Sequence, residues 1–248
     1  MKGVSLLQRG EGKDLVFLHG YLASKESFLP QIEYFSKFYR VTAFDFLGFG
    51  QSAPLTSAYS VSDYADWTAE LLQSLNIEYP HVIAHSFGGR VAIKCLSRGD
   101  IFDCAVLTGC AGIVKKRTAG YKLRVKSYRI VRKFAPKFAE KHFGSAEFKS
   151  LPPIMRESYK KIVNEDLRED AKRISRPVLF LNGSCDTETP VSQIELLNGC
   201  VRGSKMQVFE GLGHFAHLEN PNLFNLAVEE FLSCRNSESG SQSPSAVF

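Results

Sequence analysis

Short, mostly apolar runs of four residues recur along the chain, and each one ends at glycine or at a polar residue. Runs of this length are typical of strands that a parallel sheet buries on both faces. Segments between them repeat apolar residues at helical spacing, and the earliest is predicted to begin with Ser62 as its N-cap. The predicted strands cover residues 15–18, 41–44, 81–84, 105–108, 178–181 and 206–209, and the predicted helices cover residues 62–75, 88–96 and 222–234.

The alternation of strand and helix predicts an α/β fold with a doubly wound, mostly parallel sheet that helices cover. Residues 113–173 interrupt this alternation, because they contain no convincing strand and repeat apolar residues at helical spacing. We expect a helical insertion there. The predicted organisation is a core of residues 1–112 and 174–235, the insertion of residues 113–173, and a Ser-rich, disordered tail of residues 236–248.

Composition narrows the class of protein. Of the 248 residues, 44% are hydrophobic and 23% are charged, which is ordinary for a globular protein. No apolar run approaches the roughly 18 residues that a membrane span needs, and the first residues lack the apolar core of a signal peptide, so a cytoplasmic protein is expected. The six cysteines form no CxxC pair, which favours reduced thiols over a disulfide framework or a zinc site.

Ser86 lies where a predicted strand passes into a predicted helix, in the segment Ala-His-Ser-Phe-Gly-Gly of residues 84–89. This is the pattern of a nucleophile elbow, G-x-S-x-G, with alanine at its first position. The sharp turn needs small residues two before and two after the serine, and Ala84 and Gly88 meet that need. The turn would direct the Phe87 N–H and the helix N-terminus toward a developing oxyanion. A structural corner with a capping serine is the alternative interpretation.

A serine hydroxyl needs a base to remove its proton and an anion to orient that base. Asp186 follows the fifth predicted strand and His214 follows the sixth, so both lie in loops at the ligand side of the sheet. The chain order of serine, acid and histidine is the order that a nucleophile elbow of this kind requires. Glu188 and His217 lie close enough in the sequence to be alternatives for the two roles.

A second oxyanion donor is expected directly after the first predicted strand, where Gly20 lets the backbone turn close to a substrate. The N–H of either Tyr21 or Leu22 can point inward there, and we favour Tyr21. Aromatic residues near the motifs favour an apolar acyl or aromatic site, although they are equally compatible with a core role. The predicted substrate contacts are Gly20, Leu22, His85 and Phe215.

Five motifs stand at or after the ends of predicted strands: Leu-His-Gly at 18–20, Asp-Phe-Leu-Gly-Phe-Gly-Gln-Ser at 45–52, His-Ser-Phe-Gly-Gly at 85–89, Gly-Ser-Cys-Asp at 183–186 and Gly-His-Phe-Ala-His-Leu-Glu at 213–219. Together they resemble the α/β-hydrolase superfamily of lid-bearing esterases, over residues 15–234. The resemblance implies that residues 45–52 form a structural loop. It also implies that residues 113–173 form a helical cap over the active site, inserted after the sixth strand. Serine at the nucleophile position differs from the aspartate of epoxide hydrolases and haloalkane dehalogenases.

These residues predict a serine hydrolase that cleaves a carboxylic ester of a small or medium acyl substrate through an acyl-enzyme on Ser86, without a metal or organic cofactor. Thioesterase, C–C bond hydrolase and acyltransferase activities use the same residues and remain open. A small-molecule sensor on the same fold is the alternative from another class, although a pure binder has no physical need for Ser86, Asp186 and His214 together. Nothing in the chain favours a cofactor-free oxidase or peroxidase.

Residues 115–149 are strongly basic, with 12 Lys or Arg against two Glu in a chain whose net charge is +5. A solvated outer face of the cap is the simplest interpretation. Steering of an anionic ester or thioester substrate and contact with an anionic membrane surface are the alternatives. Nucleic-acid binding is disfavoured, because no recognition motif accompanies the charge.

Overall fold

The computed structural model describes residues 3–99, 101–114 and 150–240, and for residues 235–240 the backbone only. Within these residues, seven strands form one sheet in the order β1-β3-β2-β4-β5-β6-β7. β1 runs antiparallel to β3, and every other neighbouring pair is parallel. The strands are β1 (Leu6–Arg9), β2 (Asp14–Leu18), β3 (Arg40–Phe44), β4 (His81–His85), β5 (Ala105–Thr108), β6 (Val178–Gly183) and β7 (Lys205–Phe209).

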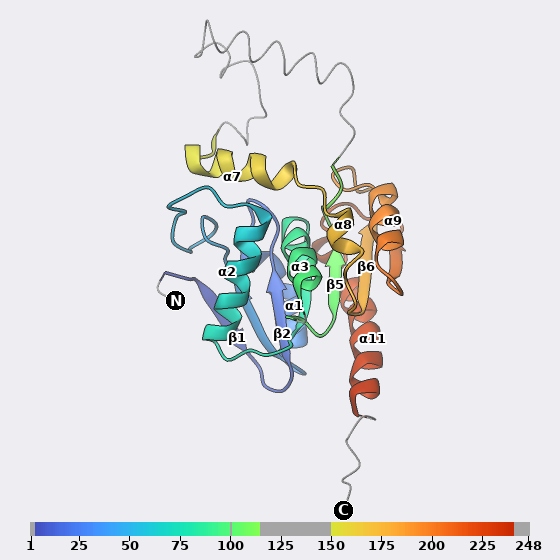
Figure 1. Ribbon diagram of the computed structural model, residues 1–248. Coiled ribbons are helices and arrows are strands. Elements are labelled where there is room, and N and C mark those ends of the chain that lie inside the picture. The colour runs from blue at the N-terminus through green and yellow to red at the C-terminus, as the bar shows by residue number, and fades with distance from the viewer. Residues whose placement is uncertain (1–2, 100, 115–149, 241–248) are drawn as a thin grey trace, which may run out of the picture.

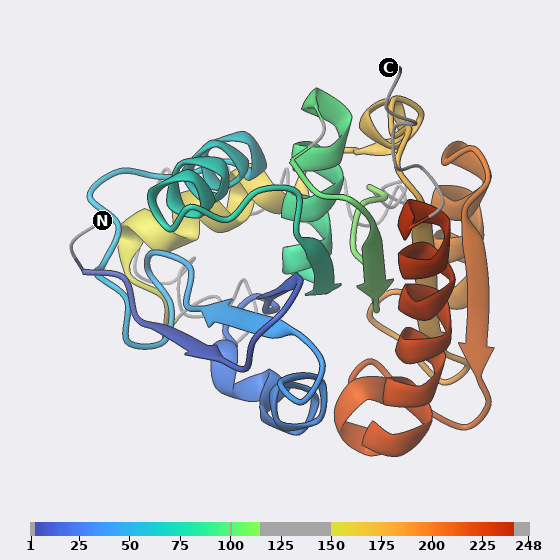
Figure 2. The same cartoon turned by 90° about the horizontal axis from the view of Figure 1, so that it is seen from below.

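Helices cover both faces of the sheet. The described helices are the 3-10 helix η1 (Lys25–Phe28) and the α-helices α1 (Leu29–Phe35), α2 (Val61–Ser74), α3 (Phe87–Arg98), α7 (Pro153–Val163), α8 (Arg168–Ala171), α9 (Val191–Cys200), α10 (Ala216–Glu219) and α11 (Pro221–Gly240). Alternate residues of β2 face two separate cores. Val16 and Leu18 pack on the side of α2 and α3, and Leu15 and Phe17 pack on the side of α1 and α11 (Figure 2). The predicted doubly wound α/β fold is therefore confirmed.

The strand order reverses at β2, because the chain passes to β3 on one side of it and later to β4 on the other. Ligand sites in such sheets lie at the carboxyl ends of the strands beside the reversal. The strands are in register there, since Leu18 in β2 pairs with Ala84 in β4. The loops after β2 and β4 therefore meet at one place, and Figure 1 shows α7 lying across this end of the sheet.

The six predicted strands are present to within two residues, and β1 is an addition. The apolar pattern misses β1 because this strand has only two apolar residues, Leu6 and Leu7; β7, at the other edge of the sheet, is also mostly exposed but has a mostly apolar run. The predicted insertion follows the fifth strand, β5, and not the sixth as expected. Four predicted strands and β1 precede the insertion in the described part of the chain, whereas the expected position requires six strands before it.

Two helix ends differ from their predictions. The N-cap of α2 is Ser60 and not Ser62: the Ser60 hydroxyl accepts from the Asp63 N–H (3.2 Å), and the Asp63 carboxylate accepts from the Ser60 N–H (2.7 Å). Helix α11 continues to Gly240, so residues 236–240 of the predicted disordered tail are helical. Each residue added to an existing helix gains a backbone hydrogen bond, which explains the extension. Residues 241–248 lie outside the described residues.

The described part of the predicted insertion contains α7 and α8 and no strand between residues 150 and 173. Its two ends meet at the sheet. The Leu167 N–H donates to the carbonyl of Gly112 (2.8 Å), and the Val114 N–H donates to the Asp166 carboxylate (3.1 Å). The basic segment of residues 115–149 lies outside the described residues. Among the described helices, none combines the length and the apolar character that crossing a membrane requires.

Candidate active site

Ser86 stands between β4 and α3 in a conformation that non-glycine residues rarely adopt, with φ of 50° and ψ of −106°. Such backbone strain costs on the order of 1–3 kcal/mol and persists only where the surrounding structure holds it. Two hydrogen bonds to the segment around the end of β5 hold it. The Ser86 N–H donates to the Thr108 carbonyl (3.0 Å), and the Ala111 N–H donates to the Ser86 carbonyl (3.3 Å). The fold thus presents Ser86 on a rigid turn at the carboxyl edge of the sheet.

The small residues around Ser86 have a steric reason. Ala84 is fully buried in the sheet. A Cβ at Gly88 would collide with the carbonyl oxygen of Leu18, and a Cβ at Gly89 would lie 2.6 Å from Sγ of Cys110. Helix α3 therefore starts so close to the end of β2 and to the residues after β5 that Gly88 and Gly89 have no room for a side chain.

Asp186 and His214 meet beyond the ends of β6 and β7. His214 Nδ1 donates to Asp186 Oδ2 at 2.8 Å, and the Asp186 side chain is fully buried while 13% of the His214 side chain is exposed. Of the two alternatives, Glu188 is exposed to solvent and His217 is fully buried. The structure therefore brings together the aspartate and the histidine that the sequence favours.

Further donors surround the Asp186 carboxylate. The Thr189 hydroxyl donates to Oδ2 (2.7 Å), and the N–H groups of Glu188 and Thr189 donate to Oδ1 (2.9 and 2.8 Å). Burial raises the pKa of Asp186, but the hydrogen bonds from His214 and Thr189 outweigh burial and bring the pKa below its ordinary value. Asp186 is consequently ionised at neutral pH, and it accepts a hydrogen bond from Nδ1 of His214, which therefore carries the ring proton.

Contacts with His85 and Gly109 join His214 to the Ser86 turn. The His85 and His214 rings are 4.7 Å apart between centroids, and His85 Nε2 donates to the His214 carbonyl oxygen (3.0 Å). A Cβ at Gly109 would lie 3.1 Å from Cε1 and Nδ1 of His214. His85 directly precedes Ser86, and Gly109 directly follows Thr108, the acceptor of the Ser86 N–H. These contacts bring the histidine loop against the elbow.

The loop after β2 is held by His19. His19 Nε2 accepts from the Phe46 N–H (3.0 Å), so Nδ1 carries the ring proton and donates to the Gly20 carbonyl oxygen (2.7 Å). Burial lowers the pKa of His19 to about 4, so the ring is neutral. In a trans peptide the N–H points opposite to the carbonyl, so the Tyr21 N–H points away from His19. Gly20 itself lies against Ser86, since an added Cβ would come 3.6 Å from the Ser86 Cβ.

The predicted substrate contacts differ in their surroundings. Leu22 and Phe215 expose 52% and 45% of their surface and follow Tyr21 and His214 directly. Leu22 also has a strained backbone with φ of 58°. His85 is only 1% exposed, and burial together with the neighbouring His217 and His214 lowers its pKa. His85 therefore lies beneath the site, whereas the two apolar side chains lie at its surface.

Helix α7 contacts the loop after β2. The Tyr21 hydroxyl donates to the Met155 carbonyl (3.2 Å), and the rings of Tyr21 and Tyr159 are 5.2 Å apart. The described part of the insertion thus reaches the residue whose N–H is the predicted oxyanion donor.

The fold and this arrangement agree with a comparison to known protein families. A model of the alpha/beta hydrolase family matches residues 15–227. The chain belongs to this family. The match includes Ser86, Asp186 and His214 and ends within α11.

Two relatives and one solved structure are distant from this alpha/beta hydrolase but match it over nearly their whole length. The (E)-2-((N-methylformamido)methylene)succinate hydrolase of Acinetobacter baylyi is 29% identical over 91% of this chain and 92% of its own. The pimeloyl-[acyl-carrier protein] methyl ester esterase of Aeromonas hydrophila is 24% identical over 92% and 99%. A solved esterase from Exiguobacterium antarcticum has a TM-score of 0.76 at 22% identity, over 93% of this chain and 95% of that one, which is a likeness of fold.

Three residues support the candidate site without having been predicted as part of it, although His19 stands in the Leu-His-Gly motif of residues 18–20. Thr189 binds Asp186, Gly109 leaves room for His214, and His19 orients the Gly20 peptide. Gly109 ends a predicted strand and His19 precedes Gly20 in the sequence, but the residues that give them their roles, His214 and Phe46, are far away along the chain. The implied structural role of residues 45–52 is consistent with buried Asp45, whose carboxylate accepts from the Lys25 N–H and from Lys25 Nζ (2.7 and 3.0 Å).

Proposed function

We propose that this alpha/beta hydrolase is a serine hydrolase that cleaves carboxylic esters of small or medium acyl groups. The observation that carries the proposal is the position of His214, which bonds to buried Asp186 and packs against the strained turn that holds Ser86. A protein that only binds small molecules has no physical need for this arrangement. The names of two proteins similar to it, a methyl ester esterase and an esterase, also favour ester cleavage.

The proton positions define the first step. Because His214 Nδ1 keeps its proton for Asp186, Nε2 carries the lone pair that accepts the proton of Ser86 Oγ. Ser86 Oγ then bonds to the ester carbonyl carbon, and the resulting oxyanion accepts from the N–H groups of Phe87 and Tyr21. As the tetrahedral intermediate collapses, the ester C–O bond breaks and the alcohol leaves with the proton from His214.

Water completes the cycle by the same route in reverse. His214 takes a proton from water, and the hydroxide oxygen bonds to the acyl carbon. Collapse of the second tetrahedral intermediate breaks the acyl–Ser86 bond, and His214 returns the proton to Ser86 Oγ. The same residues hold each transition state, so no metal or organic cofactor is needed in this scheme.

The surroundings of the site suggest how a substrate is held. Gly20, Leu22 and Phe215 would contact it, since the glycine lies against Ser86 and the two apolar side chains are exposed beside the reacting groups. His85 would act from below by holding the carbonyl of His214. Residues 113–173 would form a cap, because α7 already contacts Tyr21.

Labelling with a fluorophosphonate tests the proposal without knowledge of the substrate, because the probe reacts with activated serines. We expect rapid labelling of Ser86 in the wild type and none in Ser86→Ala. Asp186→Asn should slow labelling by about 10⁴-fold, the effect typical of a neutralised triad carboxylate, and His214→Ala by at least as much. Mass spectrometry of the labelled peptide identifies the serine. A folded wild type that is not labelled, or is labelled elsewhere, would overturn the proposal.

A further inference from the structure

Arg90 is a buried cation that forms no ion pair with any described residue. It lies on α3, one helical turn after Ser86, and only 6% of its surface is exposed. Within the described part of the chain, its side chain gives one hydrogen bond, from Nη1 to the carbonyl oxygen of Glu165 (2.8 Å), and forms no ion pair with a carboxylate. Arginine is rarely buried unless it is paired, since an uncompensated charge is costly away from water.

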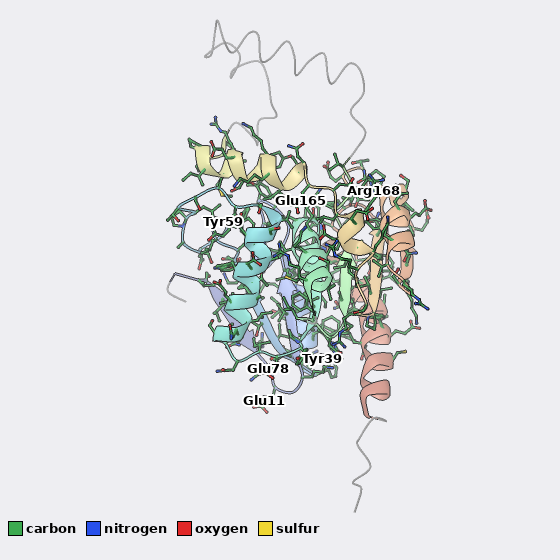
Figure 3. The ribbon with its side chains drawn as sticks, viewed as in Figure 1. Glu11, Tyr39, Tyr59, Glu78, Glu165 and Arg168 are labelled. Carbon is green, nitrogen blue, oxygen red and sulfur yellow. The ribbon has the colours of Figure 1, made fainter. Side chains whose placement is uncertain are left out.

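The two carboxylates that act electrostatically on Arg90, those of Glu165 and Asp166, each form an ion pair with another cation. Glu165 Oε1 pairs with Lys94 Nζ at 2.7 Å, and Lys94 also pairs with Asp170 (2.8 Å). Asp166 pairs with Arg168 at 2.9 Å. Figure 3 shows Glu165 at the same end of the molecule as α7. The guanidinium of Arg90 therefore keeps several N–H donors for which the described residues provide no acceptor.

The neighbours of Arg90 place it beside the candidate active site. Burial lowers its pKa, while electrostatic interaction with Cys110, Glu165, Asp166 and Tyr159 raises it by smaller amounts. Cys110 follows Gly109, the residue packed against His214, and Sγ of Cys110 lies against the first turn of α3. Tyr159 packs on Tyr21 with a ring distance of 5.2 Å. Arg90 thus lies near two residues that pack beside the candidate site, Cys110 against the first turn of α3 and Tyr159 against Tyr21.

We propose that Arg90 binds a carboxylate group of the substrate, so that the preferred ester carries an anion in addition to the bond that is cleaved. This inference rests on the proposed function and specifies its substrate class. A carboxylate provides two acceptor oxygens in the geometry of the guanidinium fork, and its charge compensates the buried cation. The competing role is structural: Arg90 would then only donate to the Glu165 carbonyl and so hold the base of the insertion, which any hydrogen-bond donor of similar length could do.

A matched pair of esters separates the two roles. We would compare p-nitrophenyl acetate with mono-p-nitrophenyl succinate, which adds a carboxylate to the acyl group. Arg90→Gln removes the charge but keeps an amide donor for the Glu165 carbonyl. We expect kcat/KM for the succinate ester to fall by about 30-fold, mainly through KM, because a charge-assisted bond is lost. For the acetate ester we expect a change of less than about threefold.

Arg98→Gln is the matched control, because Arg98 lies on the same helix, is partly exposed and pairs with Asp66. It removes the same charge from the surface and should leave both esters unaffected. Equal losses for the two esters in Arg90→Gln would overturn the proposal and assign Arg90 a structural role. If that variant does not fold, Arg90→Lys retains the charge without the planar fork and should still lose about tenfold on the succinate ester only.

Binding of free succinate separates this inference from the proposed hydrolysis. At constant ionic strength, succinate should raise the Tm of Ser86→Ala, and neutral succinamide should not. Combining Arg90→Gln with Ser86→Ala should abolish the shift. A shift that depends on Arg90 in a protein that fluorophosphonate does not label would support the anion site and reject the serine mechanism. No shift, together with no preference of the wild type for the succinate ester, would reject the anion site.

Discussion

At the scale of single residues, Gly109 shows how an absent side chain can shape a site. It closes β5 with φ of +51°, and an added Cβ would lie 3.1 Å from two ring atoms of His214. His214 fills the space that a larger residue would occupy. The orientation of the proposed base, His214, therefore depends on a residue that acts only by leaving space for the ring.

Replacing this glycine should affect activity more than stability. Gly109→Ala adds a Cβ in the left-handed region, which costs about 1–2 kcal/mol, and displaces the His214 ring. Displacement of a reacting group by about 1 Å can cost 10²-fold, so we expect fluorophosphonate labelling to slow by about that factor. Labelling rate and urea unfolding measure the two effects on the same preparation.

Gly203→Ala provides the matched control for this prediction. Gly203 also has a positive φ, +72°, but no heavy atom lies within 4 Å of an added Cβ. We expect the same order of stability loss with an unchanged labelling rate. Unchanged labelling in Gly109→Ala, or an equal loss in both variants, would contradict the role given to Gly109.

At the scale of elements, α2 shows how a helix start depends on reciprocal hydrogen bonds. Two serines stand near it, and only Ser60 forms the capping box with Asp63. The helix packs against α3 behind the elbow, where the rings of Tyr64 and Phe87 are 5.0 Å apart. Its stability therefore supports the helix that begins at Ser86.

The two serines should respond differently to substitution. Ser60→Ala removes the N-cap acceptor and should lower the free energy of unfolding by about 1 kcal/mol. Ser62→Ala lies within the first turn and should change it by less than about 0.5 kcal/mol. Urea unfolding of both variants measures the difference, and a larger loss for Ser62→Ala would reject the observed cap.

At the scale of the whole molecule, three of the four buried histidines in the described part of the chain link folding to pH. Burial lowers the pKa of His19 to about 4 and, with His214 contributing, that of His217 to about 3, and burial also lowers the pKa of His85. In the unfolded chain these rings titrate near 6.5. Between those values the unfolded state binds more protons than the folded state, so acid favours unfolding.

We expect the free energy of unfolding to decrease as the pH falls from about 6.5 to about 4, by up to roughly 1.4 kcal/mol per pH unit for each histidine. The contribution is fully present above pH 6.5. His217→Leu, which removes one titrating ring, should reduce this slope by about one proton. Urea unfolding across this range measures the slope, and an identical slope in wild type and variant would reject the linkage at His217.

Local patterns in the sequence determined most of the sheet and the position of each candidate reacting residue. Strands buried on both faces leave apolar runs, and the elbow at Ser86 needs small neighbours, so both are visible in consecutive residues. The tertiary structure decided the rest. β1 has only two apolar residues, Leu6 and Leu7, so the apolar pattern misses it, and the partners of Gly109 and Arg90 come from distant parts of the chain. Contacts between remote residues leave no periodic signal, since they depend on how the sheet brings its loops together.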